Sequence, residues 1–346
     1  MKKILLIYTG GTIGMVKDYD SNSLKPFDFN NISDKIPELN LIDAQLEVYS
    51  FENPIDSSDM NIEGWQQIAQ VIYDAYENYQ GFVVLHGTDT MSYASSALSF
   101  MLQGLKKPVI FTGSQLPIGD LRTDARENLI SSIYFATLSN ENDQPIVQEV
   151  CVYFEYKLYR GNRTVKMSSN HFDAFKSPNY PILGESGVHM TVNRDYLYRS
   201  SESSLRYYPQ LSKDIALVKI YPSMNIEFLM RILDLENLKV LVVETFGNGN
   251  IFSNEIFNIK LKEKVKEGLN VIVATQCMYG GVVLGKYSSS AIWLHVNAIS
   301  ADDLTTETVL VKAMHVLGNP KLYPDFTSGF NKNMCGEYTS SENNFS

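Results

Sequence analysis

Short, mainly apolar runs constrain the fold of this chain most, and three of those in its first half lead into turns of glycine and hydroxyl residues. The first extends from Ile4 to Tyr8 and leads directly into Thr9-Gly10-Gly11-Thr12. Strands buried on both faces have this pattern, which is typical of parallel sheets covered by helices. The pattern predicts four buried strands in the first half of the chain, at residues 4–8, 82–86, 109–112 and 150–154.

Helical periodicity fills the intervals between these runs. Apolar side chains recur at spacings of three and four from Ile62 to Tyr79, after Asp59 and Asn61, which are both suitable N-cap residues. A second helix is expected from Met91 to Leu102, ahead of Pro108. The order strand, helix, strand predicts an α/β fold in which helices flank a largely parallel sheet.

The length of 346 residues fits two domains. After a polar segment rich in Ser and Tyr, strands are expected again at 215–220, 240–245 and 271–275, with helices at 226–235, 255–267 and 306–316. We predict a larger N-terminal domain with a mostly parallel sheet (1–190), a linker (191–212), a smaller flavodoxin-like parallel α/β domain (213–330) and a flexible tail (331–346).

Charge and cysteine content restrict the cellular location and the binding partners that can be expected for this protein. The formal net charge is −10 and no stretch concentrates Lys and Arg, which disfavours nucleic acid and anionic membranes as partners. No apolar run approaches the ~20 residues that span a bilayer, and the run after Lys2-Lys3 is too short for a secretory signal. Cys151, Cys277 and Cys335 are widely spaced and odd in number, so we expect free thiols and a cytoplasmic location.

Three of the predicted strands end in polar residues, and ligands of parallel sheets bind at such strand ends. Thr12 follows two glycines and is a candidate nucleophile if a base lies near it, although the same kind of turn is as often structural. The second strand leads into Gly87-Thr88-Asp89-Thr90 and the third into Gly113-Ser114-Gln115. The convergence of three such ends predicts a functional site at this edge of the sheet.

Thr88 and Asp89 place a hydroxyl beside a carboxylate, which suits activation of water or binding of a substrate ammonium. Capping of the helix at Met91 by Asp89 or Thr90 is an equally good interpretation, and both can hold at once. The three cations of residues 160–166 (RGNRTVK) also allow two interpretations. Lys166 beside a carboxylate would tune proton transfer to a threonine, whereas a run of charges more often forms a solvated surface.

The segment Asp56-Ser57-Ser58-Asp59 offers hydroxyls and carboxylates that can bind an amino acid, with a helix cap at Asp59 as the alternative. Neither phosphate-binding glycine motif occurs, and there is no GxSxG nucleophile motif. The histidines lack metal-ligand spacing, so we predict no metal. His86 is expected to be packed. The five histidines are His86, His171, His189, His295 and His315.

Four motifs together resemble the L-asparaginase family: TGGTIG at 9–14, SSDM at 57–60, HGTDTM at 86–91 and RGNRTVK at 160–166. The segments ALSFML, KPVIFTGSQLP and TQCM further resemble its bacterial cytoplasmic (type I) branch. The resemblance extends over about residues 3 to 330 and implies two α/β domains, a homodimer or homotetramer with sites between subunits, and hydrolysis of L-asparagine to L-aspartate and ammonia without a cofactor.

The resemblance also implies roles for individual residues. Thr12 matches the nucleophile, although which threonine attacks first stays open. Thr88, Asp89 and Lys166 match the group that activates water or the nucleophile. The positions that match substrate-binding residues are Ser57, Ser58, Thr88 and Asp89, with Asp56 assisting.

The sequence departs from the family pattern in the predicted lid, residues 15–26. Alignment on Pro26 puts Leu24 where relatives carry a catalytic Tyr, and Tyr19 is the nearest candidate. A second, regulatory asparagine site is not expected, because Val165 and Glu244 are poor groups for binding an amino-acid carboxylate.

Alternatives to an asparaginase remain. They are a non-catalytic asparagine sensor on the same fold, an amidase with mixed asparagine and glutamine specificity, an ammonia-supplying amidotransferase subunit, and a nucleotide-binding protein. The intact Thr12, Thr88, Asp89 and Lys166 disfavour the sensor. The acidic charge disfavours the amidotransferase subunit, and the missing phosphate motifs disfavour the nucleotide-binding protein.

Overall fold

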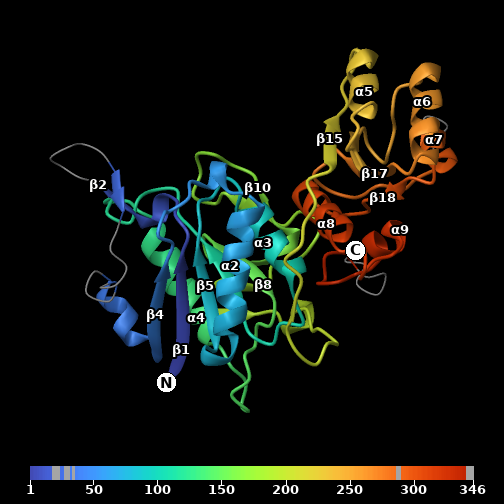
Figure 1. Cartoon of the computed structure of the whole chain (residues 1–346). Coiled ribbons are helices and arrows are strands. Elements are labelled where there is room, and N and C mark those ends of the chain that lie inside the picture. The colour runs from blue at the N-terminus through green and yellow to red at the C-terminus, as the bar shows by residue number, and fades with distance from the viewer. Residues whose placement is uncertain (18–23, 27–31, 33–35, 286–289, 340–346) are drawn as a thin grey trace. The chain divides into compact units, whose positions relative to one another are not determined.

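The computed structural model describes residues 1–17, 24–26, 32, 36–285 and 290–339. The chain divides into two compact units, Met1–Pro209 and Gln210–Ser346, which can be followed by colour in Figure 1. Each unit has its own parallel sheet and its own buried core, so each is described by itself. The predicted α/β class with two parts is confirmed.

The first unit is built on an eight-stranded sheet in the order β13-β12-β9-β8-β7-β5-β1-β4. All residues of β5, β7 and β8 are buried, as expected of strands covered on both faces. The four strands predicted from the sequence are therefore present, and they are parallel to one another. The parallel strands are β4 (Ala44–Ser50), β1 (Lys2–Tyr8), β5 (Gly81–Leu85), β7 (Val109–Thr112) and β8 (Val150–Phe154).

Helices cover both faces of this sheet. Figure 1 shows α2 (Ile62–Ala75) and α3 (Met91–Met101) on one face and α4 (Ala125–Thr137) on the other. Leu129 and Ile133 of α4 share a core cluster with Ile4 and Leu6 of β1. Alternate side chains of β1 therefore fill the core under α4, which fixes the direction of the strand and the position of the turn that follows it.

The start of α2 resolves a choice between two N-caps. The Asn61 side chain accepts a hydrogen bond from the backbone N–H of Gly64 at 2.9 Å. Asp59 lies instead in a separate 3-10 helix, Ser57–Asp59, that ends before α2 begins. The capping role expected for Asp59 is therefore wrong, because an extended residue, Met60, separates the two helices.

Antiparallel strands extend one end of the sheet, and β4 forms its other edge. The antiparallel strands are β9 (Lys157–Arg160), β12 (Gly184–Ser186) and β13 (Met190–Val192). β4 was not predicted because its polar and apolar residues alternate, as in Gln45-Leu46-Glu47-Val48, so it lacks a continuous apolar run. Shorter pairs are β2 (Met15–Lys17) with β3 (Leu24–Pro26), β6 (Leu102–Gln103) with β14 (Arg206–Tyr207), and β10 (Val165–Lys166) with β11 (Phe175–Lys176).

The second unit contains a four-stranded parallel sheet, β15 (Ile215–Lys219), β16 (Val240–Thr245), β17 (Asn270–Thr275) and β18 (Ile299–Ser300). One face packs against α5 (Ile226–Leu233) and α6 (Glu255–Lys266), and the other against α8 (Thr306–Gly318). Two short helices, α7 (Ala291–His295) and α9 (Phe326–Asn331), complete it.

The parallel α/β class of this unit is confirmed, but the strand order differs from a flavodoxin-like sheet. The described strands follow one another in chain order, whereas a flavodoxin-like sheet has its first strand between the second and third. Within the part of the chain that the structure describes, no helix is long and apolar enough to cross a membrane.

The predicted linker and tail need correction. Residues 191–209 belong to the first unit, because they complete β13 and contribute β14, whose Arg206 pairs with Gln103 of β6. The tail is packed as far as residue 339, since Cys335 is buried and Glu337 is fully buried. Both segments are polar in composition, which predicted a linker and a flexible tail, but contacts with residues far away in the sequence hold them in place.

Candidate active site

The turn after β1 passes so close to two other loops that only glycine fits. Gly10 and Gly11 have φ angles of +132° and +85°. A Cβ at Gly10 would lie 2.1 Å from the carbonyl oxygen of Ile55, and one at Gly11 would lie 2.4 Å from the backbone nitrogen of Gly87. The two glycines thus bring the Thr12 turn against the loops that carry Ser57 and Thr88. Thr12 itself starts a short 3-10 helix, Thr12–Gly14, and is partly exposed.

The loop with Asp56, Ser57 and Ser58 is fixed by its own carboxylate. Asp56 Oδ1 accepts hydrogen bonds from the backbone N–H of Ser58 at 2.9 Å and from its hydroxyl at 2.8 Å. These two donors lower the pKa of Asp56. Asp56 therefore caps the short helix that carries the two serines and orients Ser58, whose side chain is exposed, while Ser57 is buried.

Lys166 contacts both Thr88 and Asp89 in the loop after β5. Its Nζ lies 2.7 Å from Thr88 Oγ1 and 2.7 Å from Asp89 Oδ1. The Lys166 side chain is 16% exposed, whereas that of Asp89 is 67% exposed. A hydroxyl, an ammonium and a carboxylate thus form a chain at the strand ends that opens to solvent at Asp89.

These contacts decide between the two interpretations of the Thr88 loop. Thr90 occupies the N-cap position of α3, but its side chain caps no backbone N–H and donates instead to the Ser57 carbonyl at 2.6 Å. Asp89 accepts from Lys166 rather than from the helix. The capping interpretation is therefore wrong for both residues, and the Thr90 hydroxyl joins the two site loops.

The cations of residues 160–166 do not form a solvated surface. Arg160 is 3% exposed and its Nε lies 2.6 Å from Glu149 Oε2, and Arg163 is 1% exposed and donates to the Asn179 carbonyl at 2.7 Å. The two arginines hold the turn in place through these contacts, and of the three cations Lys166 is the one that contacts Thr88 and Asp89. Arg160 and Arg163 are therefore buried residues with structural contacts, whereas Lys166 belongs to the candidate site.

Gln115 is a member of the site that sequence reasoning placed only at a strand end. Its Oε1 lies 3.5 Å from Thr88 Oγ1, and its Nε2 donates to the His171 carbonyl at 2.9 Å. The buried carboxylate of Asp124 holds the Gln115 backbone N–H, at 2.9 Å from Oδ2. Burial raises the pKa of Asp124 despite these donors. A glutamine directly after a strand-end Gly-Ser was the available signal.

His86 was expected to be packed rather than catalytic. His86 is fully buried, its Nδ1 lies 2.7 Å from the Gly87 carbonyl, and burial lowers its pKa to about 4, which agrees with a packed side chain. Tyr19, the candidate lid residue, lies outside the described residues. Among the residues that the structure describes, no group of three or more His, Cys, Asp and Glu is arranged to hold a metal ion.

Comparison with protein families agrees with the two-unit fold. The N-terminal asparaginase family model matches residues 3–198, and the glutaminase/asparaginase C-terminal domain matches residues 214–326. The chain therefore belongs to the asparaginase family, as its motifs led us to expect.

Individual relatives match over nearly the whole chain. L-asparaginase 1 of Escherichia coli K12 is 37% identical over 339 residues, covering 98% of each chain. The crystal structure of L-asparaginase I from Vibrio cholerae superposes with a TM-score of 0.87 at 34% identity, covering 98% of this chain and 99% of that one. The thermostable L-asparaginase from Thermococcus kodakarensis gives a TM-score of 0.87 at 30% identity, over 98% and 100%.

Proposed function

We propose that this protein hydrolyses L-asparagine to L-aspartate and ammonia with threonine nucleophile chemistry. The observation that carries the proposal is the placement of Lys166 Nζ at 2.7 Å from both Thr88 Oγ1 and Asp89 Oδ1, at the strand ends that also carry Thr12. Membership of the asparaginase family and the L-asparaginase names of its relatives support the same substrate.

Asp89 binds the α-ammonium of the substrate, because its carboxylate is exposed and directly follows Thr88 at the strand ends. The hydroxyls and backbone N–H groups of the Ser57-Ser58 loop bind the α-carboxylate, with Asp56 holding Ser58 in place. The side-chain amide of the substrate then faces Thr12 and Thr88.

The reaction proceeds in two steps of acyl transfer. Thr12 Oγ1 attacks the side-chain amide carbon, the C–N bond breaks, and the nitrogen leaves as ammonia after taking up the hydroxyl proton. Water then attacks the resulting ester, releases aspartate and restores the hydroxyl. Backbone N–H groups of the two glycine turns stabilise the oxyanion, a contribution of ~3 kcal/mol for each donor.

Lys166 links substrate binding to proton transfer. In the free site it donates to Thr88 and Asp89, so it must lose a proton before it can accept one from Thr88. A substrate ammonium on Asp89 lies against the same carboxylate that Lys166 contacts, which places the substrate next to the proton-transfer group. Thr88 with Lys166 then activates the nucleophile or the water.

Two further properties belong to the same proposal. We infer a homodimer or homotetramer in the cytoplasm, in line with the resemblance and with three free cysteines. Glutamine differs from asparagine by one methylene, which is worth only ~1–3 kcal/mol of discrimination, so some glutamine turnover is compatible with the site.

Ammonia release from L-asparagine and L-glutamine tests the reaction. Thr12→Ala is expected to abolish release while its circular dichroism stays native, and Thr12→Ser is expected to retain part of it. Mass spectrometry of quenched Thr88→Val is expected to find an aspartyl ester on Thr12. An ester on Thr88 in Thr12→Val would reverse the roles of the two threonines, and binding of asparagine without turnover by the native protein would favour a sensor.

A further inference from the structure

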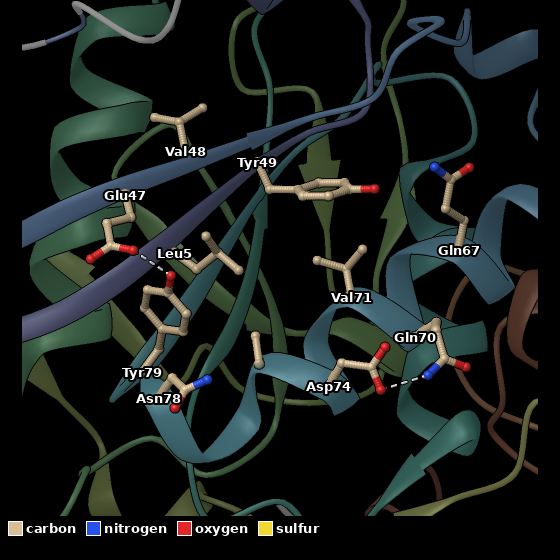
Figure 2. Close-up of a pocket in the computed structure, with 11 residues that line it drawn as sticks. Leu5, Glu47, Val48, Tyr49, Gln67, Gln70, Val71, Asp74, Asn78 and Tyr79 are labelled. Atoms are coloured by element: carbon tan, nitrogen blue, oxygen red, sulfur yellow. Dashed lines mark hydrogen bonds between the residues drawn. The ribbon is translucent and has the colours of Figure 1, made fainter.

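A groove of about 620 Å³ lies between the edge strand β4 and helix α2, apart from the residues of the candidate active site (Figure 2). This volume is in the range of sites for small molecules. Its lining includes Leu5 of β1, Glu47 and Tyr49 of β4, Val71 and Asp74 of α2, and Tyr79 after α2.

Apolar side chains form the middle of the groove. Figure 2 shows the ring of Tyr49 on β4 above the side chain of Val71 on α2, with Leu5 between these two and the Glu47–Tyr79 pair. Tyr49 is 38% exposed, although it is a large aromatic residue. A flat apolar group inserted here would cover this ring and the two aliphatic side chains.

The charged residues of the lining are both carboxylates, and no Lys or Arg belongs to it. Glu47 is already engaged, since it accepts from the Tyr79 hydroxyl at 2.6 Å and has Lys3 Nζ at 3.6 Å. Asp74 accepts only from the carboxamide of Gln70 at 2.7 Å and has no cationic partner among the described residues. The groove thus combines an apolar middle with one carboxylate that has no counter-ion in the part of the chain that the structure describes.

We propose that this groove binds a small organic amine with an aromatic or flat apolar body. The body lies between Tyr49, Val71 and Leu5, and the ammonium forms an ion pair with Asp74. A neutral ligand of the same shape leaves Asp74 without a counter-ion, and an anionic ligand is repelled by both carboxylates. The proposal does not depend on the proposed hydrolysis.

Tryptamine is the probe, followed by saturation-transfer NMR and equilibrium dialysis with the full-length protein. N-acetyltryptamine and indole-3-propionate are its neutral and anionic counterparts. We expect tryptamine to bind most tightly. Val71→Trp fills the groove and is expected to abolish binding. Asp74→Asn is expected to weaken it roughly two- to fivefold, as for an ion pair at the surface.

Glu77→Gln is the matched control, because it removes an exposed carboxylate three residues from Asp74 that does not line the groove. It is expected to leave tryptamine binding unchanged. Equal binding of the three probes, an equal effect of Glu77→Gln, or unchanged binding in folded Val71→Trp would overturn the proposal. Displacement of tryptamine by L-aspartate would also overturn it, since the probe would then occupy the candidate active site. Loss of ammonia release in any variant bears on the proposed hydrolysis and not on this binding.

Discussion

Two lysine–carboxylate pairs, one in each unit, have similar geometry and opposite surroundings. Lys166 Nζ lies 2.7 Å from Asp89 in the first unit, and Lys312 Nζ lies 2.5 Å from Glu337 in the second. The first pair is open to solvent on the Asp89 side, whereas both members of the second are fully buried.

The two pairs differ in their further hydrogen bonds within the protein. Lys312 also donates to the Lys332 carbonyl at 2.7 Å, and Glu337 accepts from the backbone N–H groups of Met334 and Cys335. Burial lowers the pKa of Lys312, and Glu337 offsets this in part. All of these contacts serve the fold, while Lys166 joins a threonine hydroxyl to an exposed carboxylate that a ligand can reach.

Replacement of Lys166 is expected to give the largest effect, and on activity alone. Lys166→Met removes the proton-transfer group, so ammonia release is expected to fall by ~10²–10⁴-fold. The free energy of unfolding is expected to change by less than about 1 kcal/mol, because Asp89 stays solvated. Steady-state rates of ammonia release check the expected loss of activity, and urea unfolding checks the expected stability. Lys176→Met, at a lysine of β11 whose side chain is 40% exposed, is the control. Loss of stability without loss of rate in Lys166→Met would contradict the comparison.

Replacement of Lys312 is expected to do the reverse. Lys312→Met leaves Glu337 buried without its cation and is expected to cost about 3–5 kcal/mol of unfolding free energy, with the rate per folded molecule unchanged. The double variant Lys312→Met/Glu337→Gln removes both charges, keeps an acceptor for Met334 and Cys335, and is expected to recover most of this loss in urea titrations. A single variant as stable as the native protein would show that the buried pair contributes nothing.

The buried pair also has a pH signature through its neighbour His315. Burial and the charge of Lys312 lower the pKa of His315 to about 3. As the pH falls from about 6.5 towards 4, the unfolded chain binds a proton at this residue and the folded chain does not, so stability is lost as the pH falls. The expected loss at pH 4 is about 3 kcal/mol.

Unfolding free energies measured between pH 4 and pH 7.5 check this sign. His315→Phe is expected to reduce the slope, and His189→Gln, at an exposed histidine, is expected to leave it unchanged. An equal slope in native protein and His315→Phe would assign the pH dependence to other groups, with the buried His86 as the next candidate.

The smallest expected effect distinguishes Asn61, which caps α2, from Asp59, which does not. Asn61→Ala is expected to cost about 1 kcal/mol of stability, because the backbone N–H of Gly64 loses its acceptor. Asp59→Ala is expected to change stability by less than about 0.5 kcal/mol. Thermal unfolding of the two variants side by side tests this ranking, which would fail if the two losses were equal.

Local sequence was sufficient for elements whose pattern repeats over a few residues. The strands at β1, β5, β7 and β8 were predicted because each is a continuous apolar run, and the Thr12 and Thr88 turns because they follow such runs directly. β4 was not predicted, because an edge strand alternates in character and its pairing with β1 is not visible locally. The linker was wrong for the same reason, since β14 depends on a partner about a hundred residues away.

The sequence by itself determined the α/β class, the motifs and the set of side chains available for chemistry. Tertiary structure alone decided that Lys166 meets Thr88 and Asp89 while Arg160 and Arg163 are buried, and that Asn61 rather than Asp59 caps α2. It also decided that Lys312 and Glu337 form an ion pair that is fully buried in the second unit. The physical reason is that residue type and spacing are local properties, whereas exposure and the choice of hydrogen-bond partner depend on segments far apart in the chain that the fold brings together.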